Sequence, residues 1–143
     1  MKKIMVICVL VGFVQTVLGQ SNQCIVQATG FKSDAGKCSI YLYKAEKGFP
    51  KDFKYSIASV SGTIENGKCR LVLKNIPKGK YAVVAHHDKN GNRKLDTNFL
   101  GMPKEGVGTS NNVKSRFGPP SFEDSTFSIV KPSSAISITI KYL

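Results

Sequence analysis

From residue 24 to the C-terminus, apolar residues recur at every second position over short stretches, which is typical of β-strands with one buried face. The alternation is clearest over residues 24–29, 38–43 and 135–142. Residues 82–87 differ because they begin with four consecutive apolar positions. A strand that is apolar on both faces is buried on both sides, so we expect residues 82–87 to form a central strand.

Two turn signatures indicate how these strands are connected. Asn66-Gly67 separates residues 56–65 from residues 68–73, and this dipeptide favours a type I′ turn, in which both central residues need a positive φ. The sequence therefore predicts a hairpin of these two segments. Tyr81 follows a Pro/Gly turn and is similar to the tyrosine corner of sandwich folds, whose hydroxyl bonds nearby backbone.

These patterns together predict an all-β domain. No helical period and no helix-capping signature is found beyond the first twenty residues. We therefore expect a single antiparallel β-sandwich of about seven strands, with a closed barrel as the alternative. The expected strands lie at residues 24–29, 38–43, 56–65, 68–73, 82–87, 125–130 and 135–142.

A long loop, residues 88–124, interrupts the strands. Connections without secondary structure seldom exceed about 12–15 residues, so we expect this loop to be internally ordered or functional. A bound metal is one way to order it. Packing as a compact flap on one sheet is another, and its apolar residues suit that role: Phe99, Leu100, Met102, Val107, Phe117 and Phe122.

The N-terminus has the layout of a secretory signal. Lys2 and Lys3 precede an apolar run over residues 4–18, which is shorter than the ~20 residues of a membrane span. We expect cleavage after Gly19, which makes residues 1–19 a signal peptide and leaves residues 20–143 as the sandwich domain. The predicted location is the periplasm or the exterior, with no membrane span after signal removal.

The chain is strongly basic, with a formal charge of +12 to which Lys2 and Lys3 contribute two. A basic exported protein attracts anionic lipid head groups, acidic glycans or nucleic acid. However, the cations are spread along the chain, with no run of five and no interleaved aromatic residues. This favours a solvated basic surface and predicts no specific nucleic-acid site.

Three cysteines remain after signal removal: Cys24, Cys38 and Cys69. An odd number in an exported protein is consistent with one disulfide and one thiol. We expect Cys38 and Cys69 to form the disulfide, because both lie in phase with inward-facing residues, although Cys24 has the same phase. The absence of a CxxC spacing argues against a zinc site or a thioredoxin-type pair.

The start of the long loop contains oxygen-bearing side chains at the spacing of a calcium loop. Asp88, Asn90, Asn92 and Asp96 occupy positions 1, 3, 5 and 9, and Lys94 would supply its main-chain carbonyl at position 7. The helix–loop–helix signature is incomplete, because Arg93 stands at position 6 instead of Gly and Phe99 at position 12 instead of Glu. The alternative is a series of Asx-turns that needs no metal.

Further polar residues of this region are candidates for contacting a ligand: His87, Asn98, Glu105, Ser110 and Asn111. A hydrolase would use His87 and Asp88. Adjacent His86 and His87 point to opposite faces of a strand, so they cannot act together. No Ser or Cys nucleophile signature accompanies them. We therefore predict that the protein is not an enzyme.

The loop also resembles a family of exported bacterial proteins called domain of unknown function 2141. Gly48-Phe49-Pro50 and the segment Pro77 to Ala82 match as well, so the resemblance covers essentially the whole chain after the signal. It implies an exported all-β domain similar to prealbumin-like or immunoglobulin-like sandwiches, and it brings no known activity, substrate or partner. Within the loop the matching residues are His87-Asp88, Asn90, Asn92, Asp96-Thr97-Asn98, Gly101, Pro103, Glu105-Gly106, Gly108, Ser110-Asn111, Phe117-Gly118-Pro119-Pro120-Ser121-Phe122 and Asp124.

The function expected from these observations is that of a non-catalytic binding or accessory module of the cell envelope, with calcium as its candidate cofactor. Its partner would be an unidentified envelope or extracellular ligand. A purely structural or interaction domain without metal is the first alternative. The hydrolase is the second.

Overall fold

The computed structural model describes residues 21–143, so the predicted signal peptide lies outside the described residues. Eight strands and two short 3-10 helices occur in the described part. The strands are β1 Gln23–Thr29, β2 Lys37–Tyr43, β3 Ala58–Gly62, β4 Lys68–Leu73, β5 Gly79–Asp88, β6 Val107–Thr109, β7 Phe127–Ile129 and β8 Ser133–Thr139; the helices are η1 Phe53–Tyr55 and η2 Ser110–Asn112.

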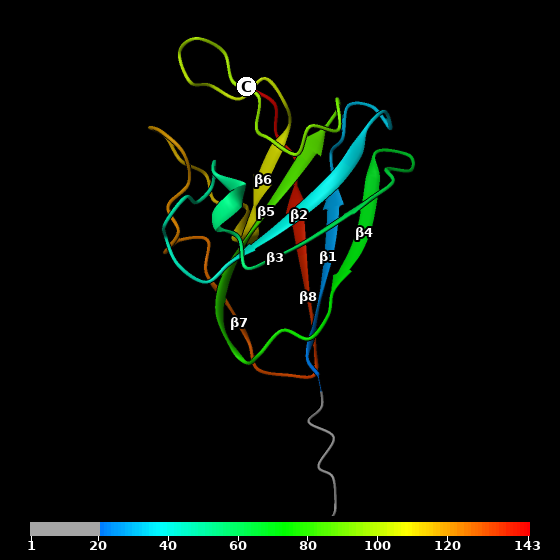
Figure 1. The fold of residues 1–143 in the computed structure, drawn as a ribbon, viewed down its shortest axis with the longest axis vertical. Helices are drawn as coiled ribbons and strands as arrows, with labels where there is room; N and C mark the ends of the chain where they lie inside the picture. The colour runs from blue at the N-terminus through cyan, green and yellow to red at the C-terminus, as the bar shows by residue number, and fades with distance from the viewer. Residues whose placement is uncertain (1–20) are drawn as a thin grey trace, which may run out of the picture.

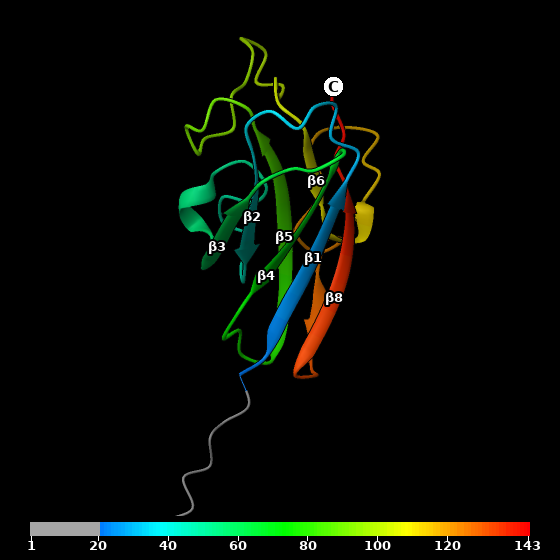
Figure 2. The same cartoon turned by 90° about the vertical axis from the view of Figure 1, so that its right-hand side faces the viewer.

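The strands form a sandwich of two sheets (Figures 1 and 2). One sheet has the order β4-β1-β8, and the other has the order β3-β2-β5-β6, with β7 pairing the first residues of β5. The two sheets do not close into a barrel, so the predicted sandwich is confirmed. Within the described residues, the pairing of β1 with β8 is parallel and the other strand pairs are antiparallel.

The alternating residues meet between the sheets as the sequence predicts. Val26 of β1, Ile40 and Leu42 of β2 and Val83 of β5 belong to one buried cluster. A second cluster lies on the outer face of the larger sheet, where Val84 packs with aromatic residues, among them Phe53. Because β5 contributes to both clusters, its prediction as a central strand is confirmed.

The predicted hairpin is correct in its turn and wrong in its pairing. Asn66 and Gly67 have φ values of 52° and 71°, as a type I′ turn requires. Nevertheless β3 pairs with β2 and β4 pairs with β1, so each arm joins a different sheet. Between these two strands, the described residues show one bridge pair, Glu65 with Lys68. Local turn chemistry directs the chain reversal but does not choose the partner of each strand.

Tyr81 has the role of the tyrosine corner that the sequence predicts. Its side chain is fully buried, and its hydroxyl donates to the carbonyl of Pro77 at 2.8 Å. This bond ties the turn before β5 to the strand itself.

Strand β6 lies within the predicted loop and returns it to the sandwich. Main-chain groups of Val107 and Lys141 bond each other in both directions at 2.9 Å, which joins the edge of the larger sheet to the chain just after β8. Gly108 is necessary for this approach, because a Cβ there would lie 2.5 Å from the carbonyl oxygen of Thr139. The side chain of Asn112 continues the closure by accepting from Thr139 N–H and donating to the carbonyl of Ser137.

Residues 21–143 contain no helix that is both long enough and apolar enough to cross a membrane.

Candidate functional site

The two adjacent histidines at the end of β5 point to opposite faces, as the strand period predicts. Both are fully buried. His87 Nε2 donates to the carbonyl of Ala35 at 2.8 Å, and its Nδ1 lies 2.6 Å from the hydroxyl of Tyr142. A ring that donates through Nε2 in its neutral form accepts through Nδ1, so Tyr142 donates to it. One nitrogen of the imidazole therefore holds the turn before β2 against β5, and the other holds the C-terminal segment there.

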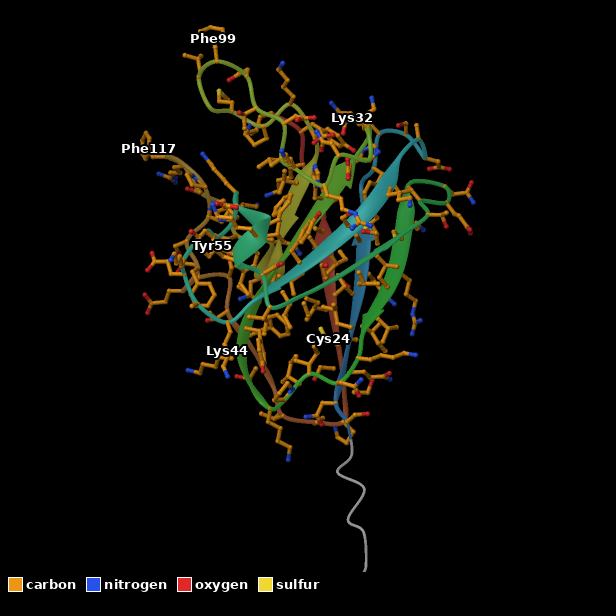
Figure 3. All side chains as sticks on the ribbon, in the orientation of Figure 1. Cys24, Lys32, Lys44, Tyr55, Phe99 and Phe117 are labelled. Carbon is orange, nitrogen blue, oxygen red and sulfur yellow. The ribbon has the colours of Figure 1, made fainter. Side chains whose placement is uncertain are left out.

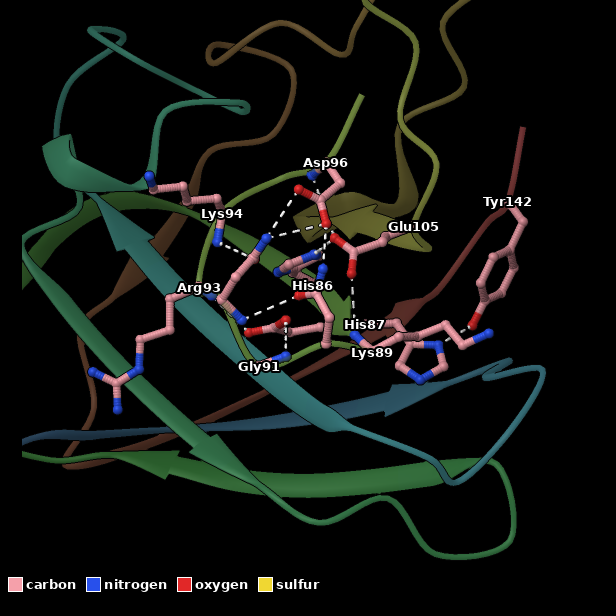
Figure 4. A network of polar contacts seen from close by, with 12 residues as sticks. His86, His87, Lys89, Gly91, Arg93, Lys94, Asp96, Glu105 and Tyr142 are labelled. Atoms are coloured by element: carbon pink, nitrogen blue, oxygen red, sulfur yellow. Dashed lines mark hydrogen bonds and ion pairs between the residues drawn. The ribbon is translucent and has the colours of Figure 1, made fainter. Parts of the chain in front are cut away.

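His86 faces the other side and meets Glu105 from the far arm of the loop. His86 Nε2 lies 2.7 Å from Glu105 Oε2. Glu105 Oε1 also accepts from Lys89 N–H at 3.1 Å, and Oε2 accepts from Asp96 N–H at 3.4 Å (Figure 4). One buried carboxylate thus joins β5 to both arms of the loop. In the described part of the chain, His86 Nδ1 is buried without a hydrogen-bond partner.

Asp88 organises the first turn of the loop. Its side chain is 1 % exposed, and its carboxylate accepts from Gly91 N–H at 2.8 Å and from Arg93 N–H at 2.9 Å. Arg93 has a φ of 58°, the left-handed conformation that glycine adopts most readily. Position 6 of the calcium-loop pattern therefore has the sharp turn that an ordinary calcium loop makes with glycine, and Arg93 directs its guanidinium away from the network (Figure 4).

Asn90, Asn92 and Asp96 form the outer part of the network. The Asp96 carboxylate accepts from Asn90 Nδ2 at 2.6 Å and from Asn92 Nδ2 at 2.9 Å. Asn90 Oδ1 accepts from Asn92 N–H, and Asn92 Oδ1 accepts from Lys94 N–H, so the predicted Asx-turns are formed. The bonds from Asn92 and Asn90 hold the pKa of Asp96 below its usual range, because they stabilise the carboxylate form.

The donors in this loop are oxygen atoms, which fits a hard cation and no softer one. Within residues 21–143, no three side chains of the His, Cys, Asp and Glu types gather as a metal site. A cation would therefore depend on amide and main-chain oxygens in addition to Asp88 and Asp96. It would also have to replace the amide groups of Asn90 and Asn92 as partners of Asp96.

The other predicted ligand-contacting residues hold the loop together. Asn98 Oδ1 accepts from the N–H groups of Leu100 and Met102. Ser110 is fully buried, and its hydroxyl accepts from Val83 N–H at 2.9 Å. Asn111 Nδ2 donates to the carbonyls of Asp124 and Thr126. These hydrogen bonds give the three side chains a structural role.

The sequence did not reveal the partners of the two histidines. Glu105 is nineteen residues from His86 and Tyr142 is fifty-five residues from His87, and neither spacing belongs to a local motif. The Gly106-Val107-Gly108 sequence was the available signal, since glycines around an apolar residue indicate a close approach of two backbones.

The three cysteines of the described part are buried free thiols, so the predicted disulfide of Cys38 and Cys69 is not formed in the structure. These two thiols are nevertheless the pair that meets, across the two sheets. Their mutual hydrogen bond, with burial, raises the pKa of Cys38, while the same bond lowers the pKa of Cys69. Cys24 lies apart, and burial raises its pKa to about 11.

Residues 26–137 match the model of a family described as "uncharacterized protein conserved in bacteria (DUF2141)". The chain belongs to this family. The DUF2141 match runs from within β1 to within β8, so it includes both sheets and the whole loop region. No curated protein and no solved structure gives a significant match. The DUF2141 description assigns no activity.

Proposed function

We propose that this DUF2141 protein is an exported, non-catalytic binding or accessory module of the bacterial cell envelope. One observation carries the proposal. The buried side chains that could perform acid–base chemistry make structural hydrogen bonds: Asp88 and Glu105 bond main-chain groups of the loop, His86 Nε2 pairs with Glu105, and His87 bonds Ala35 and Tyr142.

The residues that could act as acid or base are buried, whereas other side chains of the loops are exposed, and this difference supports a non-catalytic function. A general acid or base must reach the substrate proton within hydrogen-bonding distance, whereas His87 is fully buried between Ala35 and Tyr142. The loop end instead exposes two large aromatic rings, with Phe99 96 % exposed and Phe117 93 % exposed, and cations such as Arg116 are exposed beside them. Exposed apolar groups beside cations are suited to recognition.

We further propose that calcium orders the loop weakly. The left-handed φ of Arg93 and the two main-chain bonds to Asp88 support it, because they give the loop the sharp turn of a calcium loop before any ion binds. The low pKa of Asp96 keeps a negative charge available there. Two carboxylates among five ligands place the affinity in the weak, submillimolar to millimolar range of extracellular modules.

Thermal unfolding of residues 20–143 tests the calcium proposal. At calcium concentrations of about 10 to 100 times Kd, binding to the native state adds about 1.4 to 2.7 kcal/mol, which corresponds to a Tm increase of roughly 5 to 10 °C for a domain of this size. Asp96→Asn should abolish the increase. Asp124→Asn, which changes an exposed carboxylate in the same loop region, should leave it intact, and magnesium should not reproduce it.

A calcium response that is absent, or that survives Asp96→Asn, would refute the ion site and leave a loop held by its own hydrogen bonds. Export is tested separately by the mass of the protein recovered from cell fractions. We expect an N-terminus at Gln20 in the periplasm or the medium. Full-length protein confined to the cytoplasm would refute export.

A further inference from the structure

The loop end carries most of the exposed large apolar side chains in the described part of the chain. Eight large hydrophobic side chains are exposed in the described residues, and five of them belong to the long loop or the C-terminus: Phe99, Leu100, Met102, Phe117 and Leu143. Phe99 and Phe117 stand at the tips of two separate loops that project from the sandwich, at the end opposite the start of β1 (Figure 3). Among the described residues, the exposed large apolar side chains therefore gather mostly at this end.

Both tips are held in place from within. At the first tip, the side chain of Asn98 accepts from two main-chain N–H groups, those of Leu100 and Met102. At the second tip, Ser115 Oγ donates to the carbonyl of Phe117 at 3.0 Å. These bonds fix turns that leave the two rings in solvent, where each exposes nearly all of its apolar surface. Neither ring contributes to either buried cluster of the fold.

A groove of about 740 Å³ lies between the two tips and has a basic lining. Leu100 and Met102 line it from the first loop, Arg116 and Gly118 from the second, and Leu143 from the C-terminus. Four cationic side chains contribute to it, and no Asp or Glu side chain does among the described residues that line it: Lys51, Lys114, Arg116 and Lys141.

The loops around the groove also have an excess of positive charge. Residues 93–104 and 113–120 contain five cations and a single carboxylate, Asp96, whose oxygens accept from Asn90 and Asn92. The five cations are exposed: Arg93, Lys94, Lys104, Lys114 and Arg116. An apolar surface surrounded by cations complements a partner with an apolar interior and an anionic surface. An anionic phospholipid bilayer has this structure.

We propose that the loop end docks on an anionic phospholipid membrane. Phe99 and Phe117 enter the boundary between head groups and acyl chains, and the cations of the two loops contact lipid phosphates. This inference rests on the proposed binding function and names its partner. In this orientation the two loops contact the bilayer. The start of β1, which lies at the opposite end of the sandwich (Figure 3), faces away from it.

Co-sedimentation of residues 20–143 with vesicles tests the proposal, because the described part of this chain contains both complete sheets. One set of vesicles is pure phosphatidylcholine, and the other contains about one-third phosphatidylglycerol. The paired variant Phe99→Ala with Phe117→Ala removes the apolar tips. Its matched control, Ile57→Ala with Val130→Ala, removes exposed apolar side chains elsewhere.

We expect binding to the anionic vesicles only, weakened by salt. The loss of both tip rings should reduce the partition coefficient at least about tenfold, since burial of each ring contributes apolar transfer energy. Lys114→Gln with Arg116→Gln should reduce it roughly 25-fold, at about fivefold per charge near an anionic surface. Lys44→Gln with Lys78→Gln, which removes the same charge away from the groove, should reduce it much less.

Three results would overturn the proposal: no binding to anionic vesicles, equal binding to neutral and anionic vesicles, or unchanged binding by the Phe99/Phe117 variant. Analytical ultracentrifugation of the same proteins tests whether a second copy of the chain covers the groove instead of a membrane. The proposal would also be overturned if the wild-type protein forms a dimer, the Phe99/Phe117 variant is a monomer, and the wild-type protein does not bind vesicles. The calcium and export experiments are independent of lipid. Failure with vesicles alone therefore removes the membrane partner and leaves the binding module.

Discussion

Replacement of Asp88 by alanine should destabilise the domain strongly, because this buried carboxylate accepts two main-chain hydrogen bonds. Each bond to a charged group contributes about 1.5 to 3 kcal/mol, so the loss of both should cost about 3 kcal/mol or more. The N–H groups of Gly91 and Arg93 would lose the partners they have at 2.8 and 2.9 Å.

The expected change in Tm follows from the size of the domain. With an unfolding entropy of about 2.1 cal/mol/K per residue, a domain of roughly 120 residues loses about 4 °C per kcal/mol. Asp88→Ala should therefore lower Tm by roughly 12 °C. The measurement is calorimetry in chelator, so that an ion cannot contribute, with hydrogen exchange at the amides of Gly91 and Arg93 as a local readout.

Asp124→Ala is the matched control, because its carboxylate is exposed and bonds the nearby Ser121 hydroxyl. It should change Tm by no more than about 2 °C, as is usual for surface substitutions. If Asp88→Ala melts within about 3 °C of the wild-type protein and its amides stay protected, the two hydrogen bonds do not hold the loop.

Two further predictions concern the core. Tyr81→Phe leaves the Pro77 carbonyl without its 2.8 Å donor and should lower the free energy of unfolding by about 1 to 2 kcal/mol, or Tm by roughly 4 to 8 °C. The control variant Tyr55→Phe, at the surface, should not change Tm measurably. Equal Tm values for the two variants would contradict the role of the tyrosine corner. Burial raises the pKa of Cys24 from 9.0 to about 11, so between these values the unfolded chain releases a proton that the native state keeps. Stability should fall as pH rises through this window, and the decline, measured by urea unfolding at pH 8 and 10.5, should be shallower in Cys24→Ala; parallel declines would exclude Cys24 as a source.

The fold was predictable wherever a local rule acted. The alternation of apolar and polar residues predicted that Val26 and Ile40 lie in the core and that His86 and His87 point to opposite faces. The Asn66-Gly67 dipeptide predicted the turn that it forms. The pairing of the strands could not be predicted from the sequence in the same way. The two strands that flank this turn belong to different sheets, because the partner of each strand depends on which strand edges other parts of the chain already occupy.

The loop was predictable in its composition and not in its contacts. Asp88 and the asparagines after it indicated turns or an oxygen-ligand site, and the turns are present. The bonds of Glu105 and Tyr142 to the histidines depend on where distant segments return to the sandwich. The short strand β6 was not predicted, because only three of its residues pair. One glycine precedes these residues and another lies among them, which obscures the alternation of apolar and polar positions.

The bridge between Val107 and Lys141 affects how the protein behaves at high concentration. Unpaired sheet edges are templates for strand addition by other molecules and so for aggregation. In the described part of the chain, this bridge and the side chain of Asn112 cover the side where β6 and β8 lie, and the edges of β3 and β4 stay open on the opposite side. There Lys68 and Arg70 put positive charge on exposed positions of β4. Edge-to-edge association is therefore restricted to one side of the sandwich, and like charges oppose it there.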